Sequence, residues 1–470
     1  MTIITRTLSV EDFGIWNIIL SLVVYSLVLD PIISFWATRE IARKNESGKT
    51  AIFSSGIFSI AGIAIYLIIS YFTGLESDID VGVLWFAVFL IPLSFINKSL
   101  QSVNNATKPH IISIGQTVSI AIKIPLALYL LYFMDYGILG IVFVHACGLI
   151  ANSIILFIYA RNQFKNKFEI KFLKNWIKFS WLSLYPRISV FLQSLDIVIF
   201  VIITNSVSGV AYFSIALVIG SLVAYSEKFS QPMYAKLLGG GSLDQIQNNL
   251  TRFFYFAFPL TAISIVFSQA GLHVLNPEYA ILISVVIILS LRFLVMAIKN
   301  TLSVYLQGEE SVDTKKESTF RDYIRSQLFF LPTLGIITYS VYLISLVVGL
   351  ILFSNNYSSI QLVTFWAITG LVVEIPVTIY IYFKVHRKLS LKLEKSSILK
   401  YLIGSIIAFG LMFFAIERFL SYTDTLFVFI PNLLLFVTFG IMIYLMFTLV
   451  VDMKTRTFVR SILNEMLKKK

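Results

Sequence analysis

The sequence has few charged residues and almost no cysteine. Charged side chains make up 13% of its 470 residues, whereas about a quarter of an ordinary soluble domain is charged. The single cysteine, Cys147, lies inside an apolar run, which excludes a disulfide framework and a cysteine-based metal site. The four histidines form no HxxxH pair. The sequence therefore predicts no metal site and no cofactor.

What the sequence has instead is long apolar runs. Hydrophobic residues make up 57% of the chain, and the mean hydropathy is +0.85. A bilayer core about 30 Å thick needs about 20 apolar helical residues, because lipid offers no partner to unpaired backbone groups. Thirteen segments are long enough: 13–37, 51–73, 81–103, 111–133, 138–160, 179–203, 210–234, 249–271, 280–306, 327–352, 359–383, 399–419 and 426–450. We predict an all-α polytopic membrane protein.

The loops between these segments alternate in charge. One set of alternate loops, together with the C-terminal tail, holds most of the lysines and arginines, including six between residues 161 and 178. The other set holds Arg6 as its only basic residue. Basic loops stay in the cytoplasm, so we predict a cell-membrane protein with a cytoplasmic C-terminus. The net charge of +12 then reflects topology and contact with anionic lipids rather than a nucleic-acid partner.

A short stretch near the start of the chain recurs further on. Residues 8–20 resemble residues 205–217, at an offset of 197 residues that aligns Ser9 with Ser206. Transporters are often built from repeated halves. We therefore predict an N-terminal lobe over 1–170, a C-terminal lobe over 171–383, and two further helices with a basic tail over 384–470. Segment 179–203 precedes the second copy but has no counterpart before the first. We expect a parent architecture of 14 spans whose first helix is missing here, and about 20 apolar residues encoded upstream of Met1.

Two motifs resemble a known family. The first is Arg6-x-Leu8-x-x-Glu11-Asp12-Phe13-Gly14-Ile15-Trp16, followed by Asp30 and by Arg39-Glu40-Ile41-Ala42-Arg43. The second runs from Lys174 to Ser180 and continues with Pro186, Asp196 and Gly209-Val210-Ala211-Tyr212-Phe213. Both are similar to the lobe openings of Wzx-type polysaccharide flippases, whose superfamily also contains MATE exporters and lipid II flippases.

The resemblance implies a fold and a function. It implies two six-helix bundles around a V-shaped cavity, alternating access, and export of a lipid-linked oligosaccharide. The partners implied are this glycan substrate, membrane lipids and glycan polymerase or ligase machinery. The missing first helix departs from the family pattern and would leave the first lobe incomplete.

Ionisable residues inside the spans carry the functional expectations. Such residues cost at least about 2.5 kcal/mol at mid-bilayer and tend to face a cavity. Arg252, Lys228 and Arg418 lie near span ends, where long side chains reach the headgroups. The candidate substrate-binding cations are Lys98, Lys123, Arg187, Arg292 and Lys299. The candidates for ion or proton coupling are Asp30, Asp196 and Glu374, which could alternatively neutralise a nearby cation.

Helical spacing supports a cationic cavity. Arg292 and Lys299 are seven residues apart and lie on one helix face, as do Gln116, Ser119 and Lys123. Polar stripes that include a cation suit the phosphate of a lipid-linked sugar. A flippase of lipid-linked oligosaccharide is therefore our first hypothesis, a MATE-like cation-coupled exporter the alternative, and a membrane glycan polymerase or ligase the remote one. Because every outer loop is short, we predict that the protein is not an enzyme.

Overall fold

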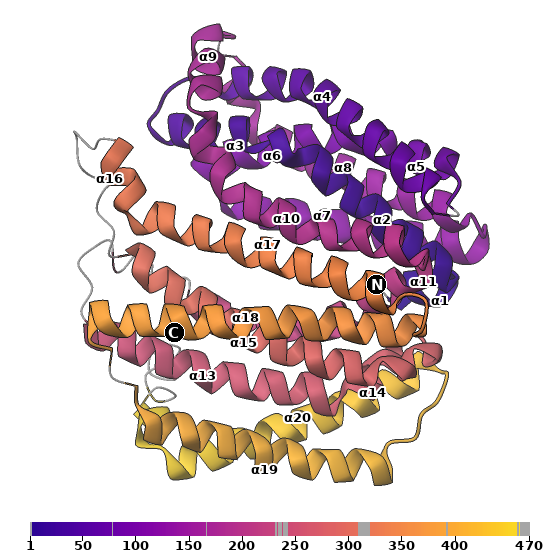
Figure 1. Ribbon diagram of the computed structural model, residues 1–470, viewed down its shortest axis with the longest axis vertical. Coiled ribbons are helices and arrows are strands. Elements are labelled where there is room, and N and C mark those ends of the chain that lie inside the picture. The colour runs from indigo at the N-terminus through magenta and orange to yellow at the C-terminus, as the bar shows by residue number, and fades with distance from the viewer. Residues whose placement is uncertain are drawn as a thin grey trace. The chain divides into compact units, whose positions relative to one another are not determined.

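Every regular element that the structure describes is helical. The structure is a computed structural model, and it describes residues 2–77, 79–165, 167–230, 233, 237, 243–308, 320–391, 393–457 and 460. The helices of the first half are α1 (Thr2–Thr7), α2 (Val10–Ser26), α3 (Pro31–Ala42), α4 (Gly48–Leu75), α5 (Val81–Phe86), α6 (Leu90–Thr107), α7 (His110–Ala127), α8 (Gly137–Ala160), α9 (Ile170–Lys178), α10 (Ser180–Thr204) and α11 (Val207–Gly220). Those of the second half are α13 (Leu243–Val266), α14 (Ser268–Leu275), α15 (Ile283–Gly308), α16 (Phe320–Arg325), α17 (Gln327–Phe353), α18 (Ser359–Leu389), α19 (Lys395–Phe419) and α20 (Leu426–Val451) (Figure 1).

Thirteen helical stretches of the described residues are long and apolar enough to cross a membrane. Large apolar side chains on their outer faces are exposed, such as Ile60 at 68%, Ile406 at 62% and Phe414 at 69%. A soluble protein does not leave such continuous apolar surface in water, whereas lipid requires it. The chain is an all-α polytopic membrane protein, and the predicted fold class is confirmed.

The predicted first span, 13–37, is interrupted. Its apolar stretch covers Val10–Leu29, and α3 begins at Pro31 after a short 3₁₀ turn. Proline has no N–H and is suited to the first position of a helix. Asp30 therefore lies at a break between two helices, as the proline beside it predicts.

The chain divides into two compact units. Unit 1 comprises Met1–Tyr212 with Pro332–Leu362, and unit 2 comprises Phe213–Leu331 with Val363–Lys470. The three-part division over 1–170, 171–383 and 384–470 stays a prediction. Several basic residues of the loops predicted to be cytoplasmic lie outside the described residues, among them Lys236, Lys315, Lys316 and Lys392.

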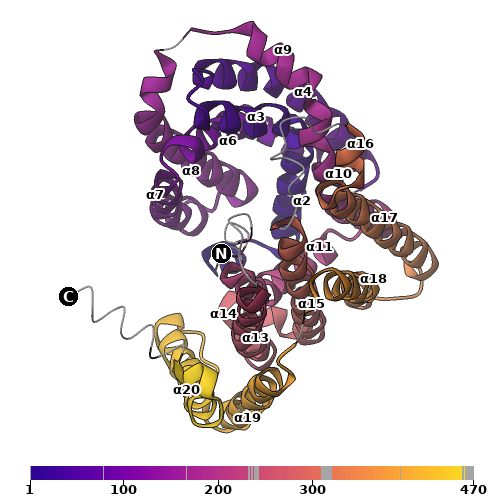
Figure 2. The same ribbon diagram turned by 90° about the vertical axis from the view of Figure 1, so that its left-hand side faces the viewer.

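Unit 1 is built around α6 and α8. Helix α8 packs on both α6 and α7, and Figure 2 shows α7 and α8 side by side. Leu100, Val103 and Leu156 are buried in one core cluster at this packing. The side chain of Asn104 donates 2.9 Å hydrogen bonds to the carbonyls of Leu100 and Leu156, which ties α6 to α8.

Unit 2 contains the last two helices. Helices α19 and α20 pack on each other and on α13 (Figure 1). Their shared core includes Tyr255, Phe409, Phe429 and Tyr444, all buried. The hydroxyl of Tyr444 donates a 2.7 Å hydrogen bond to the carbonyl of Tyr255.

The two serines aligned by the sequence repeat make the same contact. Ser9 Oγ accepts a 3.0 Å hydrogen bond from the backbone N–H of Asp12 at the start of α2. Ser206 Oγ accepts a 3.1 Å bond from the N–H of Gly209 at the start of α11. A serine in this position satisfies an otherwise unpaired backbone donor. The local similarity therefore extends to backbone geometry, while the lobe correspondence stays a prediction.

Candidate functional site

The candidate site is a polar cavity in unit 1. It consists of three adjoining hollows of about 210, 330 and 460 Å³, all lined in part by Lys98 of α6. Asp30 and Arg187 line two of them, and Lys123 lines the third. We call these hollows together the basic cavity.

The carboxylate of Asp30 is the acidic group of the basic cavity. Its position at the break between α2 and α3 lets Oδ2 accept a 3.0 Å hydrogen bond from Ser34 Oγ. Within the described part of the chain, Oδ1 has no hydrogen-bond partner although the residue is only 8% exposed. Lys98 and Arg187 lie close enough to interact with this carboxylate electrostatically. The carboxylate and both cations thus belong to one electrostatic group.

Amide side chains form one wall of the cavity. The Nδ2 of Asn97 donates a 2.8 Å hydrogen bond to Ser153 Oγ. Its Oδ1 accepts from Gln101 Nε2 at 2.6 Å and from Asn152 Nδ2 at 3.2 Å. This network links α6 to α8 and holds Gln101 at the cavity surface. These amides were not among the predicted site residues, because an uncharged polar residue in an apolar helix carries a weaker sequence signal than a charge.

The side chain of Lys123, on α7, packs against α8 at Gly148. Gly148 of α8 makes room for it, since a Cβ at that position would lie 1.9 Å from Lys123 Cε. The ammonium lies 3.5 Å from Nδ1 of His145, whose ring meets Trp16 edge-on with centroids 5.3 Å apart. The predicted polar stripe of Gln116, Ser119 and Lys123 lines the cavity as well. The contact between Lys123 and His145 was not predicted, because 22 residues separate them.

Arg292 is buried in unit 2. It lies on α15 and is 4% exposed. Its guanidinium packs against α18 at Gly370, where a Cβ would lie 2.4 Å from Arg292 Cζ. This glycine is what allows so large a cation to fit between the two helices.

Lys299 and Glu374 form a buried ion pair further along the same face of α15. Lys299 Nζ donates a 2.6 Å hydrogen bond to Glu374 Oε2, and the two side chains are 12% and 2% exposed. Gly370 and Glu374 are four residues apart on α18, just as Arg292 and Lys299 share one face of α15. The second possibility for Glu374, the neutralisation of a nearby cation, matches this geometry. Its role in coupling stays a prediction.

Asp196 of α10 lies apart from the basic cavity residues. Its Oδ2 accepts a 2.8 Å hydrogen bond from the hydroxyl of Tyr342 on α17, and the residue is 7% exposed. The structure therefore divides the predicted residues into three groups. One is Asp30, Lys98, Arg187 and Lys123; the next is Arg292, Lys299 and Glu374; the last is Asp196. No cluster among the described residues has a composition that could hold a metal ion.

The basic cavity is suited to an anion. Lys98, Arg187 and Lys123 face it together with Arg39, which also lines the largest hollow, and Asp30 is the only carboxylate among the described lining residues. Ammonium and guanidinium groups bind phosphate through charge-assisted hydrogen bonds. Amides and hydroxyls such as Gln101, Gln116 and Ser119 bind polyhydroxylated groups.

No family model and no curated protein sequence matches this chain, but solved structures do. One is the lipid II flippase MurJ in an inward closed conformation: TM-score 0.67, 16% identity, covering 97% of this chain and 94% of that chain. Another is a multidrug resistance MATE family transporter of the MOP superfamily, inward-facing, with a TM-score of 0.59, 12% identity and coverage of 83% and 93%. A MATE structure in a bent conformation has a TM-score of 0.51, 14% identity and coverage of 84% and 94%. At these identities the similarity establishes the fold, which this chain shares with these proteins.

Proposed function

We propose that this protein is a Wzx-type flippase that moves a lipid-linked oligosaccharide from the cytoplasmic to the outer leaflet of the cell membrane by alternating access. The observation that carries the proposal is the charge of the basic cavity. Three predicted cations, Lys98, Arg187 and Lys123, line it with one carboxylate. The phosphate between lipid and sugar is the part of such a substrate that these cations would bind.

The wall of the cavity supports the same substrate class. Asn97, Gln101 and Asn152 form a hydrogen-bonded set beside the cations. The amide of Gln101, which this set holds at the cavity surface, suits sugar hydroxyls, whereas a cationic drug would need acidic and aromatic lining groups. Similarity to a structure named as a lipid II flippase over 97% of the chain adds support from fold alone.

A second candidate is a MATE-like exporter coupled to a cation. It is favoured by the buried Asp30 carboxylate, whose Oδ1 is left without a hydrogen-bond partner among the described residues. Such an oxygen is able to bind a proton. In this case Asp30 would be the essential residue, and the neighbouring cations would adjust its protonation.

The setting of the proposed activity follows from the substrate. A flippase of this kind supplies glycan polymerase or ligase machinery at the outer surface of the cell membrane, with its own basic loops and C-terminus in the cytoplasm. Substrate binding by Arg292 and Lys299 of unit 2 stays a prediction.

Complementation of a deletion strain tests the proposal. We expect Lys123→Ala and Arg187→Ala to abolish surface glycan, to cause lipid-linked sugar to accumulate, and to leave protein abundance unchanged. Surface glycan is measured by antibody or lectin staining, the lipid-linked intermediate by mass spectrometry and abundance by immunoblot. Arg418→Ala is the matched control, because Arg418 lies exposed near the end of α19.

Two outcomes would contradict the proposed flippase function. Normal surface glycan in both cavity variants would contradict the cationic-cavity model. Efflux of a cationic dye from proteoliposomes that is lost in Asp30→Asn but retained in Lys123→Ala would favour the exporter instead.

A further inference from the structure

A second polar pocket lies in unit 2 at one end of three membrane-spanning helices. It has a volume of about 320 Å³ and is lined by Asn248, Thr251, Arg252, Tyr255, Tyr401, Lys454, Thr455 and Thr457. Each of these eight residues carries a hydrogen-bonding side chain, although the helices around them are strongly apolar. We call it the terminal pocket, because it lies where α19 begins and α20 ends. It shares no lining residue with the basic cavity.

One wall of the terminal pocket is a single face of α13. Asn248, Thr251, Arg252 and Tyr255 are three, four and seven residues apart, the spacing that aligns side chains along a helix. Arg252 is exposed, and its position near a span end led us to expect that it reaches the headgroups. The guanidinium of Arg252 belongs to a residue that lines this pocket.

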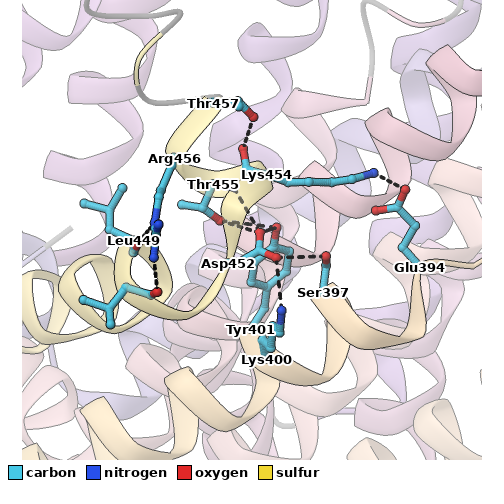
Figure 3. Close-up of polar contacts among 11 residues, drawn as sticks. Glu394, Ser397, Lys400, Tyr401, Leu449, Asp452, Lys454, Thr455, Arg456 and Thr457 are labelled. Carbon is cyan, nitrogen blue, oxygen red and sulfur yellow. Dashed lines mark hydrogen bonds and ion pairs between the residues drawn. The ribbon is translucent and has the colours of Figure 1, made fainter.

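The opposite wall is fixed by Asp452, as Figure 3 shows. Its Oδ2 accepts hydrogen bonds from the Tyr401 hydroxyl at 2.9 Å and from the N–H and hydroxyl of Thr455 at 3.0 Å each. Its Oδ1 accepts from Ser397 Oγ at 3.1 Å and lies 3.7 Å from Lys400 Nζ. Asp452 is 2% exposed, and a carboxylate so buried is stable only when its oxygens are satisfied.

Asp452 thereby holds two lining residues, Tyr401 and Thr455, in place. Thr455 is itself only 2% exposed, and the chain after α20 is anchored onto α19. Lys454 is oriented by an ion pair with Glu394 (Figure 3). These contacts hold the lining side chains of this wall in fixed positions.

The lining groups select the chemistry of a ligand. Arg252 contributes positive charge, Lys454 contributes a charge that it shares with Glu394, and no carboxylate is among the described lining residues. The Arg252 guanidinium and the Asn248 amide carry N–H groups that can donate to oxygen acceptors. The hydroxyls of four other lining residues donate to oxygens of the protein itself: Thr251, Tyr401, Thr455 and Thr457. A ligand with several acceptor oxygens and a negative charge fits this set, and a phosphate ester has both. The volume is at the small end of the range for ligand pockets, about 300 to 1,000 Å³.

We propose that the terminal pocket binds a phosphate ester at the cytoplasmic membrane surface, with Arg252 as the principal contact. The basic loops predict that this end of α13, α19 and α20 faces the cytoplasm. Two sources share the required chemistry: the headgroup of an anionic phospholipid of the inner leaflet, and a soluble phosphate ester. The proposal is independent of the transported cargo.

The test uses the purified full-length chain in detergent and native mass spectrometry. We expect one dioleoylphosphatidylglycerol to bind more tightly than a phosphate-free glucosyl diacylglycerol. Arg252→Gln should weaken phosphatidylglycerol binding about tenfold, the loss of one charge-assisted hydrogen bond. Arg418→Gln, the matched control on α19, should leave the affinity unchanged. Asn248→Ala, which removes one exposed amide from the pocket lining, should weaken it about threefold and remains informative if Arg252→Gln does not fold.

The source of the phosphate is distinguished by adding glycerol 3-phosphate without lipid. Binding of phosphatidylglycerol alone assigns the pocket to a lipid headgroup. Binding of glycerol 3-phosphate that depends on Arg252 assigns it to a soluble ester. Equal affinity for both lipids, together with no binding of glycerol 3-phosphate, would overturn the proposal. So would an Arg252→Gln or Asn248→Ala variant that folds and binds as well as Arg418→Gln.

Discussion

The ammonium of Lys299 donates a 2.6 Å hydrogen bond to Oε2 of Glu374 and so joins α15 to α18 through a buried ion pair. Removing one partner of such a pair leaves an unpaired buried charge, at a cost of about 3 kcal/mol or more. We expect Glu374→Ala and Lys299→Ala each to lower the melting temperature in detergent. The double variant Lys299→Met with Glu374→Leu should recover most of that loss, because apolar residues can replace a buried pair.

Transport activity of this double variant separates structure from coupling. A stable double variant that still exports glycan would show that Glu374 serves only to neutralise Lys299. A stable but inactive one would show that transport needs at least one of these charges, either Glu374 in ion or proton coupling or Lys299 in substrate binding.

Arg292 and Gly370 provide the next prediction. We expect Arg292→Ala to abolish glycan export without lowering protein abundance. Gly370→Ala should have a similar effect, because its Cβ would occupy the place of the guanidinium, 2.4 Å from Arg292 Cζ. Residues that act through one contact give non-additive effects, so adding Gly370→Ala to Arg292→Ala should cause no further loss. Full export by a normally abundant Gly370→Ala variant would show that this packing is not needed.

The lowered pKa of Asp452 predicts that the stability of the protein depends on pH. Burial raises the pKa of this carboxyl, but hydrogen bonds from Tyr401, Thr455 and Ser397 outweigh burial and hold the pKa below its usual value near 3.8. A lowered pKa in the folded state means that ionised Asp452 stabilises the fold above about pH 4 and that this contribution disappears as the pH falls through the folded-state pKa.

The Asp452→Asn variant tests this sign. We expect it to be less stable than the wild type by about 2 kcal/mol at pH 7, and the difference to shrink below about pH 4. The measurement is the melting temperature of both proteins in detergent between pH 7 and pH 3. A difference that does not change with pH would mean that the charge of Asp452 contributes nothing.

The predicted orientation is tested with single cysteines. Replacing Cys147 by serine removes the only native thiol. In that background Asn356→Cys places one thiol just before α18, and Ser396→Cys places one at the start of α19, beyond the other end of α18. Both positions are exposed. In intact cells a membrane-impermeant maleimide should label Asn356→Cys and not Ser396→Cys. The reverse pattern would contradict a cytoplasmic C-terminus.

The sequence alone determined the class of the protein and the number of its visible spans. Thirteen apolar runs predicted thirteen helices, and thirteen were found among the described residues, because in lipid the length and polarity of a segment largely decide whether it can cross. The sequence also identified the charged residues within the spans, since each is costly there. Pro31 also predicted that the helix hydrogen bonds are interrupted beside Asp30, and α3 begins at that proline.

Only the tertiary structure decided which of those charges meet. Helical periodicity placed Arg292 and Lys299 on one face of α15, but it could not show that Glu374, 75 residues away, would pair with Lys299. Nor could it show that Gly148 and Gly370 make room for Lys123 and Arg292. Such contacts join side chains from different helices, and the packing that brings them together leaves no periodic pattern in either segment. The Asp452 contacts, which link α19 to the chain after α20, arise in the same way.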